Sequence, residues 1–272
     1  MSWLPSPDWQ PLTAGTGQST GGVWLTPAGQ VVKRLVPGVD DPRHHAYWKR
    51  QALVASSGIV ATTHGLRSPD CLGVEEDTAG ITLRMAAVAP ADWAPDELAA
   101  ALGRFGRAQV DEPGWGARDV LRDRLRTVER RGGWAALART GLGSAAIDEL
   151  WVRREAGLAA LDKLPRVPTH GDAHPVNLLG RDGDDVIAID WEQFGLGPAG
   201  FDLGYLALAA HTPLDELVAA HGGDVGRGAV LVAAYTGVSR AAWSLGRRDP
   251  GDHIDRLLQL EPIINEAAEV VA

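Results

Sequence analysis

The chain has 272 residues, of which 45% are hydrophobic and 22% charged, a composition typical of a globular protein with one large domain or two modest ones. The formal net charge of −9 argues against a nucleic-acid partner, because phosphate binding depends on Lys and Arg. No run approaches the roughly 20 apolar residues of a membrane span, and the N-terminal MSWLPSPDWQ lacks a signal-peptide pattern. The only cysteine, Cys71, excludes an internal disulfide framework. These features predict a cytoplasmic protein with no membrane or nucleic-acid partner, and no obligate protein partner is evident.

The first 90 residues carry strand patterns. WQPLTA, the Gly-rich GTGQSTGG, VWLTP and VVKRLV predict three antiparallel strands, and CLGVEE and GITLRMAAV predict two more. Between these groups, DPRHHAYWKRQALVASSG is typical of a helix, with Asp41 as N-cap, Pro42 in the first turn and Gly58 at its end.

Beyond Val88 the pattern becomes helical, with a strand-like interruption that begins after Pro165 and ends with DDVIAID. The fold class predicted from this order is α+β with two lobes. Residues 1–88 would form a small antiparallel-sheet N-lobe, and residues 89–272 a larger, mainly helical C-lobe. The hinge between them is expected at about residues 85–91.

Polar residues concentrate in the stretch THGDAHPVNLLGRDGDDVIAIDWE, residues 169–192. A carboxylate at Asp172, on a tight loop after Gly171, could accept a proton from a substrate hydroxyl. Asn177 could offer its carbonyl oxygen to Mg²⁺, and Asp190, at the end of a strand, could supply the main metal carboxylate. One Asp and one Asn suffice, since Mg²⁺ keeps water and substrate phosphates among its ligands.

Each of these residues also has a purely structural interpretation. A single Asp or Asn on a turn usually caps or shapes the turn, so the spaced set carries the argument. His170 and His174 are expected to stabilise the loop, with Pro175 rigidifying the turn that presents Asn177. A zinc site at the two histidines is disfavoured, because their spacing requires a helix and the sequence between them does not favour one.

The segments HGDAHPVN and IDWE resemble the catalytic segment of the aminoglycoside phosphotransferase and choline kinase families, which share the protein-kinase-like fold. The resemblance implies that Asp172 is the catalytic-loop aspartate and that Asn177 and Asp190 bind the metal. It also implies that Lys33, one of only three lysines, holds the α and β phosphates of the nucleotide. Asp202 would tie down the loop without touching the substrate.

The resemblance also assigns the rest of the nucleotide site. The turn at residues 15–20 would cover the phosphates, with close backbone approach at glycines and hydrogen bonds from hydroxyls. The segment at residues 85–88 would read the adenine edge. The nucleotide-binding candidates in these two segments are Gly15, Gly17, Ser19, Thr20, Met85 and Ala87.

One departure concerns the partner of Lys33. Kinase-like enzymes usually pair this lysine with a glutamate on the following helix, but residues 42–69 contain no Glu or Asp. Gln51 could accept a hydrogen bond from the ammonium group, or Glu75 or Glu76 could approach from the next strand. A lysine without a carboxylate partner would be held less firmly.

The implied reaction is Mg²⁺-dependent transfer of the γ-phosphoryl group of ATP, or of GTP, to a small-molecule hydroxyl acceptor. Aminoglycosides, amino sugars, other sugars, amino alcohols and macrolides remain open, and the acidic net charge slightly favours a cationic acceptor. Trp243, Glu261 and Glu266 are candidate pocket residues, although Trp243 also fits a core position and both glutamates fit a solvated helix face.

Two other functions remain open. The missing helix carboxylate is compatible with a catalytically impaired module that only binds nucleotide or another ligand, although such a module would have no need of a base at Asp172. A metal-dependent hydrolase would need a second metal cluster, for which the sequence offers no convincing spacing.

Overall fold

A computed structural model of the chain describes residues 3–12, 19–248 and 251–272. Its N-terminal part is an antiparallel sheet in the order β1-β2-β3-β6-β5. The strands are β1 (Gln10–Pro11), β2 (Thr20–Leu25), β3 (Gln30–Leu35), β5 (Cys71–Asp77) and β6 (Gly80–Ala86). The strand predictions for this part of the chain are confirmed, and the central position of β3 buries Lys33.

The first helix is shorter than predicted. α1 (Arg50–Ser57) ends at Gly58, which has a left-handed φ of 66°, as expected for a helix-terminating glycine. The predicted start at Asp41 is wrong, because residues 41–49 form turns and a bridge instead. The cause is Arg50, the first residue of α1.

Arg50 is fully buried and organises the chain before it. Its guanidinium group donates to the carbonyl oxygens of Pro42, His44 and His45 at 2.8–2.9 Å. In an α-helix each of these carbonyl groups would accept from the backbone N–H four residues later. Here they are turned toward Arg50 instead. Residues 41–49 therefore wrap around one side chain, and the helix begins only at that side chain.

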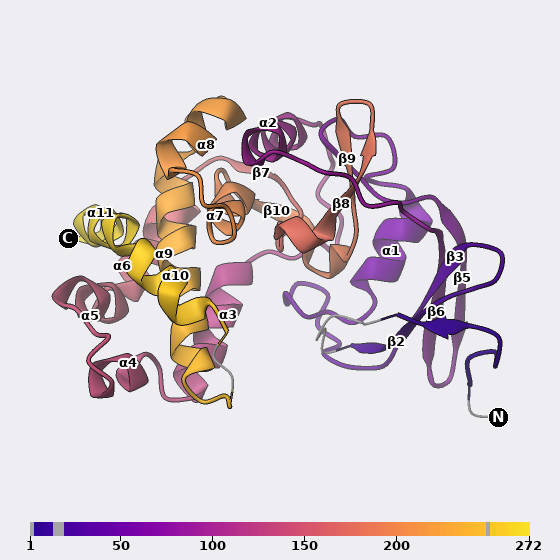
Figure 1. Cartoon of the computed structure of the whole chain (residues 1–272), viewed down its shortest axis with the longest axis horizontal. Helices are drawn as coiled ribbons and strands as arrows, with labels where there is room; N and C mark the ends of the chain where they lie inside the picture. Colours follow the sequence, from indigo (N-terminus) through magenta and orange to yellow (C-terminus); the bar gives the residue numbers. More distant parts are fainter. Residues whose placement is uncertain (1–2, 13–18, 249–250) are drawn as a thin grey trace.

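The remainder of the chain is mainly helical, as predicted. The helices are α2 (Pro95–Gly106), α3 (Val120–Arg130), α4 (Ala135–Arg139), α5 (Ala145–Val152), α6 (Arg154–Asp162), α7 (Phe201–Ala207), α8 (Leu214–His221), α9 (Gly226–Ser244), α10 (His253–Gln259) and α11 (Glu261–Val271). α9 is apolar on all sides because α3, α7, α10 and α11 surround it (Figure 1). Gly204 permits the close approach of α7, since a Cβ there would lie 2.7 Å from the carbonyl oxygen of Ala229.

Short strands interrupt the helical part where the sequence predicted them. β7 (Arg166–Thr169) pairs with β10 (Gly195–Pro198), and β8 (Leu178–Asp182) pairs with β9 (Asp185–Ala188). The two-residue strand β4 (Leu66–Arg67) comes from the N-terminal part and pairs in parallel with β9. The β8–β9 hairpin thus lies between the large sheet and the helices (Figure 1). No helix among the described residues is long and apolar enough to cross a bilayer.

Candidate active site

The loop after β7 is held by a buried carboxylate on α7. Asp202 accepts hydrogen bonds from the backbone N–H groups of His170, at 2.7 Å, and Gly171, at 2.9 Å. Gly171 has a left-handed φ of 82°, and a Cβ there would lie 2.5 Å from the carbonyl oxygen of Gln193. A glycine is therefore required at the turn that presents Asp172. The contacts of Asp202 match the anchoring role expected from the sequence.

His170 stabilises the same loop and is fully buried. Its Nδ1 accepts from the backbone N–H of Asp172 at 3.3 Å, and its Nε2 lies 2.8 Å from the carbonyl oxygen of Ile189. These partners fix the tautomer, since Nδ1 must be the acceptor and Nε2 the donor. Both ring nitrogens are thus engaged with the backbone, which supports the structural interpretation of His170.

Asn177 lies directly beside Asp172. It ends a short 3₁₀ turn, Pro175–Asn177, and its Nδ2 donates to the backbone oxygen of Asp172 at 2.9 Å and to its Oδ2 at 3.1 Å. Because both partners are acceptors, the amide orientation is determined, and the side-chain oxygen of Asn177 is left to face another ligand. An amide oxygen placed beside a carboxylate is suited to a hard cation such as Mg²⁺.

Asp190 follows β9 in a conformation that is unusual for a residue with a side chain. Its φ of 65° is the only positive value at a non-glycine residue in the described ranges. Such backbone conformations cost on the order of 1–3 kcal/mol and are concentrated at functional sites. The backbone N–H of Ile189 donates to the carbonyl oxygen of Asn177 at 2.8 Å, so Asn177 and Asp190 are tied together at the end of the hairpin.

Lys33 reaches this hairpin from β3. Its Nζ donates to Oδ1 of Asp190 at 2.8 Å, across 157 positions of the chain. The partners suggested from the sequence are wrong for this structure: Glu76 pairs with Lys49 at 2.7 Å, and Glu75 lies 3.8 Å from Arg84. The buried Oε1 of Gln51 has no hydrogen-bond partner within the described residues. The buried ammonium group is thus neutralised by a candidate metal ligand.

The sequence analysis missed a third carboxylate in this group, Glu192. Burial raises its pKa to about 7, and the nearby negative charge of Asp190 acts in the same direction, while Lys33 opposes both. The sequence offered one signal, the acidic residue two positions after Asp190 in IDWE. A partly buried carboxyl group with a raised pKa is a further candidate for cation binding at this site.

The remaining nucleotide-site candidates are distributed around the sheet. Gly15 and Gly17 lie outside the described residues. Ser19 is buried, and its carbonyl oxygen accepts from the backbone N–H of Val36 at 2.8 Å. The structure places the other three as follows: half-buried Thr20 begins β2, buried Met85 lies in β6, and exposed Ala87 follows β6.

A cavity of about 510 Å³ opens beside Asp172 between α3, α7 and α9. Its wall includes Arg124, Arg240 and Trp243, whose side chain is 44% exposed, so Trp243 does not occupy a core position. Glu261 and Glu266 are exposed on α11 and do not belong to this wall, in agreement with the solvated interpretation. The helical sequence patterns of α3 and α9 had not indicated Arg124 or Arg240 as site residues.

Two guanidinium groups approach Asp172 within this cavity. Nη2 of Arg124 lies 3.8 Å from Oδ1 of Asp172, and Nη2 of Arg240 lies 3.9 Å from the same oxygen. Both arginines stack on Tyr205, with their Cζ atoms 4.6 and 5.1 Å from the ring centre. A carboxylate that accepts a proton would thus work in a positively charged environment.

Comparison with known proteins identifies similarity over most of the chain. A family model described as "Phosphotransferase enzyme family" matches residues 24–238. No curated protein sequence matches the chain.

Solved structures of similar fold include a choline/ethanolamine kinase family protein from Mesorhizobium loti, at 18% identity and a TM-score of 0.61 over 97% of this chain and 92% of that one. Choline kinase from Streptococcus pneumoniae matches at 13% identity and a TM-score of 0.59, with 94% of each chain covered. An ADP-bound aminoglycoside phosphotransferase matches at 15% identity and a TM-score of 0.56, over 97% of this chain and 94% of that one. The predicted α+β, protein-kinase-like fold is confirmed.

Proposed function

Since the chain belongs to the phosphotransferase enzyme family, we propose that it transfers the γ-phosphoryl group of ATP, or of GTP, to a hydroxyl group of a small molecule. The observation that carries this proposal is the convergence of Asp172, Asn177, Asp190 and Lys33. Three contacts link them: Asn177 to Asp172, Asn177 to the residue before Asp190, and Lys33 to Asp190. Asn177 and Asp190 flank the open end of the β8–β9 hairpin, Asp172 lies in the loop before it, and Lys33 reaches it from β3.

The nucleotide is proposed to lie between an N-lobe of residues 1–88 and a C-lobe of residues 89–272. Lys33 would bind its α and β phosphates, and the turn that contains Gly15, Gly17, Ser19 and Thr20 would cover them. The base would lie against the hinge at Met85 and Ala87. This arrangement is supported by the burial of Lys33 at the centre of the sheet, where it faces Asp190.

Mg²⁺ is proposed to bind at Asn177 and Asp190, with Glu192 beside them. The donor set fits: it offers an amide oxygen and two carboxyl groups, all hard ligands. Bound there, Mg²⁺ would neutralise charge on the transferring phosphate. Lys33 would then exchange part of its contact with Asp190 for a contact with phosphate oxygens.

Asp172 is proposed to orient the acceptor hydroxyl and take its proton. The hydroxyl oxygen forms a bond to the γ-phosphorus as the bond from that phosphorus to the bridging oxygen breaks, and the bridging oxygen keeps the electron pair on the departing nucleoside diphosphate. Most of the acceleration would come from positioning and charge neutralisation. Only a short 3₁₀ turn (Trp191–Gln193) and β10 separate Asp190 from α7, which supports a small-molecule acceptor over a protein.

The test is a coupled assay of nucleoside diphosphate release with Mg²⁺ and ATP or GTP, across aminoglycosides, macrolides, amino sugars, neutral sugars, amino alcohols, hydroxy acids and sugar phosphates. Stimulation by one acceptor is expected, with kcat lowered about 10²- to 10⁴-fold in Asp172→Asn. The matched control is Asp184→Asn, an exposed aspartate in the β8–β9 turn, which should leave kcat unchanged. Nucleotide binding without turnover on any acceptor would instead favour a binding module of the same fold.

A further inference from the structure

The cavity beside Asp172 has an unusual charge for a protein with a net charge of −9. Its described wall contains three arginines, Arg124, Arg131 and Arg240, and a single carboxylate, Asp172. Burial lowers the pKa of His45, which also borders the cavity, so this imidazole is neutral at pH 7 and adds no charge. The cavity therefore carries a positive excess exactly where the acceptor of the proposed reaction would bind.

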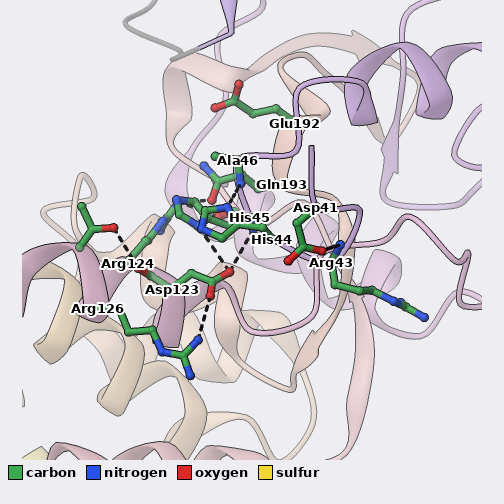
Figure 2. A network of polar contacts seen from close by, with 12 residues as sticks. Asp41, Arg43, His44, His45, Ala46, Asp123, Arg124, Arg126, Glu192 and Gln193 are labelled. Carbon is green, nitrogen blue, oxygen red and sulfur yellow. Dashed lines mark hydrogen bonds and ion pairs between the residues drawn. The ribbon is translucent and has the colours of Figure 1, made fainter. Parts of the chain in front are cut away.

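Asp123, a carboxylate on α3 that does not belong to the cavity wall, has partners of its own. Asp123 accepts from the backbone N–H of His45 at 3.1 Å and lies 3.7 Å from Arg126, so its charge is already paired (Figure 2). Figure 2 also shows Arg124 turned away from Asp123 toward Gln193, to which its Nη2 donates. Arg124 and Arg240 thus share one carboxylate, and both contacts, at 3.8 and 3.9 Å, are too long for hydrogen bonds.

Two residues of the same wall hold polar atoms without a hydrogen-bond partner. Nη1 of Arg124 and Oγ1 of Thr236 are buried and have no hydrogen-bond partner among the described residues. Within the described residues, the contacts of the Arg240 guanidinium group are its ion pair with Asp172 and its stacking on the ring of Tyr205. Leaving a buried donor unpaired costs about 1–3 kcal/mol, so a ligand that reached these groups would relieve that cost.

We infer that the acceptor is an anionic hydroxyl compound, whose carboxylate or phosphate group is bound by Arg124 and Arg240 while its hydroxyl lies at Asp172. Guanidinium groups match both anions in geometry and can donate two parallel hydrogen bonds to either. The cavity, at about 510 Å³, is within the range of small-molecule sites. The inference rests on the proposed function, since it assigns the substrate class of that reaction.

This charge distribution contradicts the slight preference for a cationic acceptor that the net charge suggested. The affinity for an acceptor depends on the charge of the cavity wall. Apart from Asp172, the acidic residues that make the net charge of the chain negative lie outside this wall. Choline, which appears in the names of two structural neighbours, is a quaternary ammonium ion. Two guanidinium groups at the wall would repel such a ligand.

The first test measures binding directly, by calorimetry on the full chain saturated with Mg²⁺ and ADP so that the nucleotide site is filled. The probes are malate, for a carboxylate, and inorganic phosphate, with choline as the cationic comparison. Saturable binding of malate or phosphate is expected, and binding about 10- to 100-fold weaker in Arg240→Gln. The control is Arg139→Gln, an exposed arginine of α4, which should bind as the wild type does.

The two anions separate the possible sources, because stronger binding of malate identifies a carboxylate acceptor and stronger binding of phosphate a phosphorylated one. Saturable binding of neither anion, or equal binding by Arg240→Gln and wild type, would overturn the inference. Arg124→Lys, which keeps the charge, is a second variant in case Arg240→Gln does not fold.

The second test uses acceptors that share a skeleton: gluconate, glucose 6-phosphate, glucose and glucosamine, each assayed for ADP release. Turnover of an anionic member with little or none of glucose and glucosamine would agree with the binding result. Preferred turnover of glucosamine or glucose would overturn the inference and leave the proposed phosphotransfer intact. Anion binding at the arginines together with absence of any nucleotide-dependent transfer would overturn the proposed phosphotransfer, and the cavity would then be an anion-binding site and not an acceptor site.

Discussion

The loop that presents Asp172 and the cavity beside it share this residue but differ in how their polar groups are satisfied. In the loop, the backbone N–H groups of His170 and Gly171, both ring nitrogens of His170 and the amide nitrogen of Asn177 all have partners. In the cavity wall, a guanidinium nitrogen of Arg124 and the hydroxyl of Thr236 have none within the described residues. The polar groups of the loop are therefore satisfied within the protein, whereas some of those in the cavity wall are not.

A fully paired network is rigid, because every side chain would lose a hydrogen bond by moving. The loop can thus hold Asp172 in one orientation in the absence of substrate. An unpaired polar group in a buried wall lowers the stability of the free protein. Substitutions in the first region should therefore lower folding stability, whereas substitutions in the second should affect ligand binding and can even raise stability.

The largest effect on stability is expected at Arg50, which supports the segment around Glu192 from the side of the sheet. Besides the three carbonyl oxygens described above, its guanidinium group donates to the carbonyl oxygens of Trp115, at 2.8 Å, and Glu192, at 2.6 Å. Arg50→Met would leave buried carbonyl groups without a donor and should lower the free energy of unfolding by about 3–5 kcal/mol. Urea denaturation measures this change.

The matched control for Arg50 is Arg43→Met. The side chain of Arg43 is 39% exposed and pairs with Glu112 at 2.7 Å, so its loss should cost about 0–1 kcal/mol. Equal destabilisation by the two variants would show that the buried hydrogen bonds of Arg50 add no more stability than an exposed ion pair. Paired buried groups would then not explain the stability of this part of the protein.

A smaller effect is expected at the loop anchor, Asp202. Asp202→Asn keeps one oxygen for one of the two backbone N–H groups and replaces the other acceptor by a donor. The free energy of unfolding should fall by about 1–3 kcal/mol, because one buried N–H group loses its partner. Burial raises the pKa of Asp202, which means that its negative charge is costly to keep in the folded protein. Asp202→Asn removes this cost together with the hydrogen bond, so its loss of stability should be smaller than that of Arg50→Met.

The loosened loop should also lower kcat while nucleotide binding, measured separately by calorimetry, stays unchanged. Asp224→Asn, an exposed aspartate before α9, serves as the control and should change neither quantity. A stable Asp202→Asn variant with wild-type kcat would mean that the loop keeps its shape without this anchor.

The parts that could be predicted from sequence are those whose residues are close together in the chain. Asp172 and Asn177 are five positions apart, and a hairpin of fixed register brings Asp190 back to them. The partner of Lys33 could not be predicted in this way, because the sequence showed only which carboxylate was missing from the following helix. The contact with Asp190 depends on how the sheet packs on the hairpin.

The start of α1 and the cavity wall were missed for a related reason. Asp41 and Pro42 carry an ordinary helix-start pattern, but a buried Arg50 drew the carbonyl groups of that segment to itself, and tertiary contacts override local propensity. Arg124 and Arg240 lie on helices 116 positions apart in the sequence, each within an ordinary amphipathic or buried pattern. Only the packing of α3 against α9 places both beside one carboxylate.

The smallest expected effect has the opposite sign and tests the comparison most directly. Thr236→Val replaces a buried hydroxyl that has no partner in the described structure by a methyl group of similar size. It should raise the free energy of unfolding by about 0.5–1 kcal/mol, because an unpaired polar group is removed. Thr169→Val is the matched control, since Oγ1 of Thr169 is equally buried but donates to the carbonyl oxygen of Gly195 at 3.3 Å, and its loss should lower the same quantity by about 1 kcal/mol. If both variants lose stability to the same extent, the hydroxyl of Thr236 is already satisfied in the free protein, for example by an ordered water molecule, and the cavity wall is no less paired than the loop. Changes of opposite sign in the free energy of unfolding would show that the hydroxyl of Thr236 lowers the stability of the free protein. This is expected of a polar group that serves ligand binding.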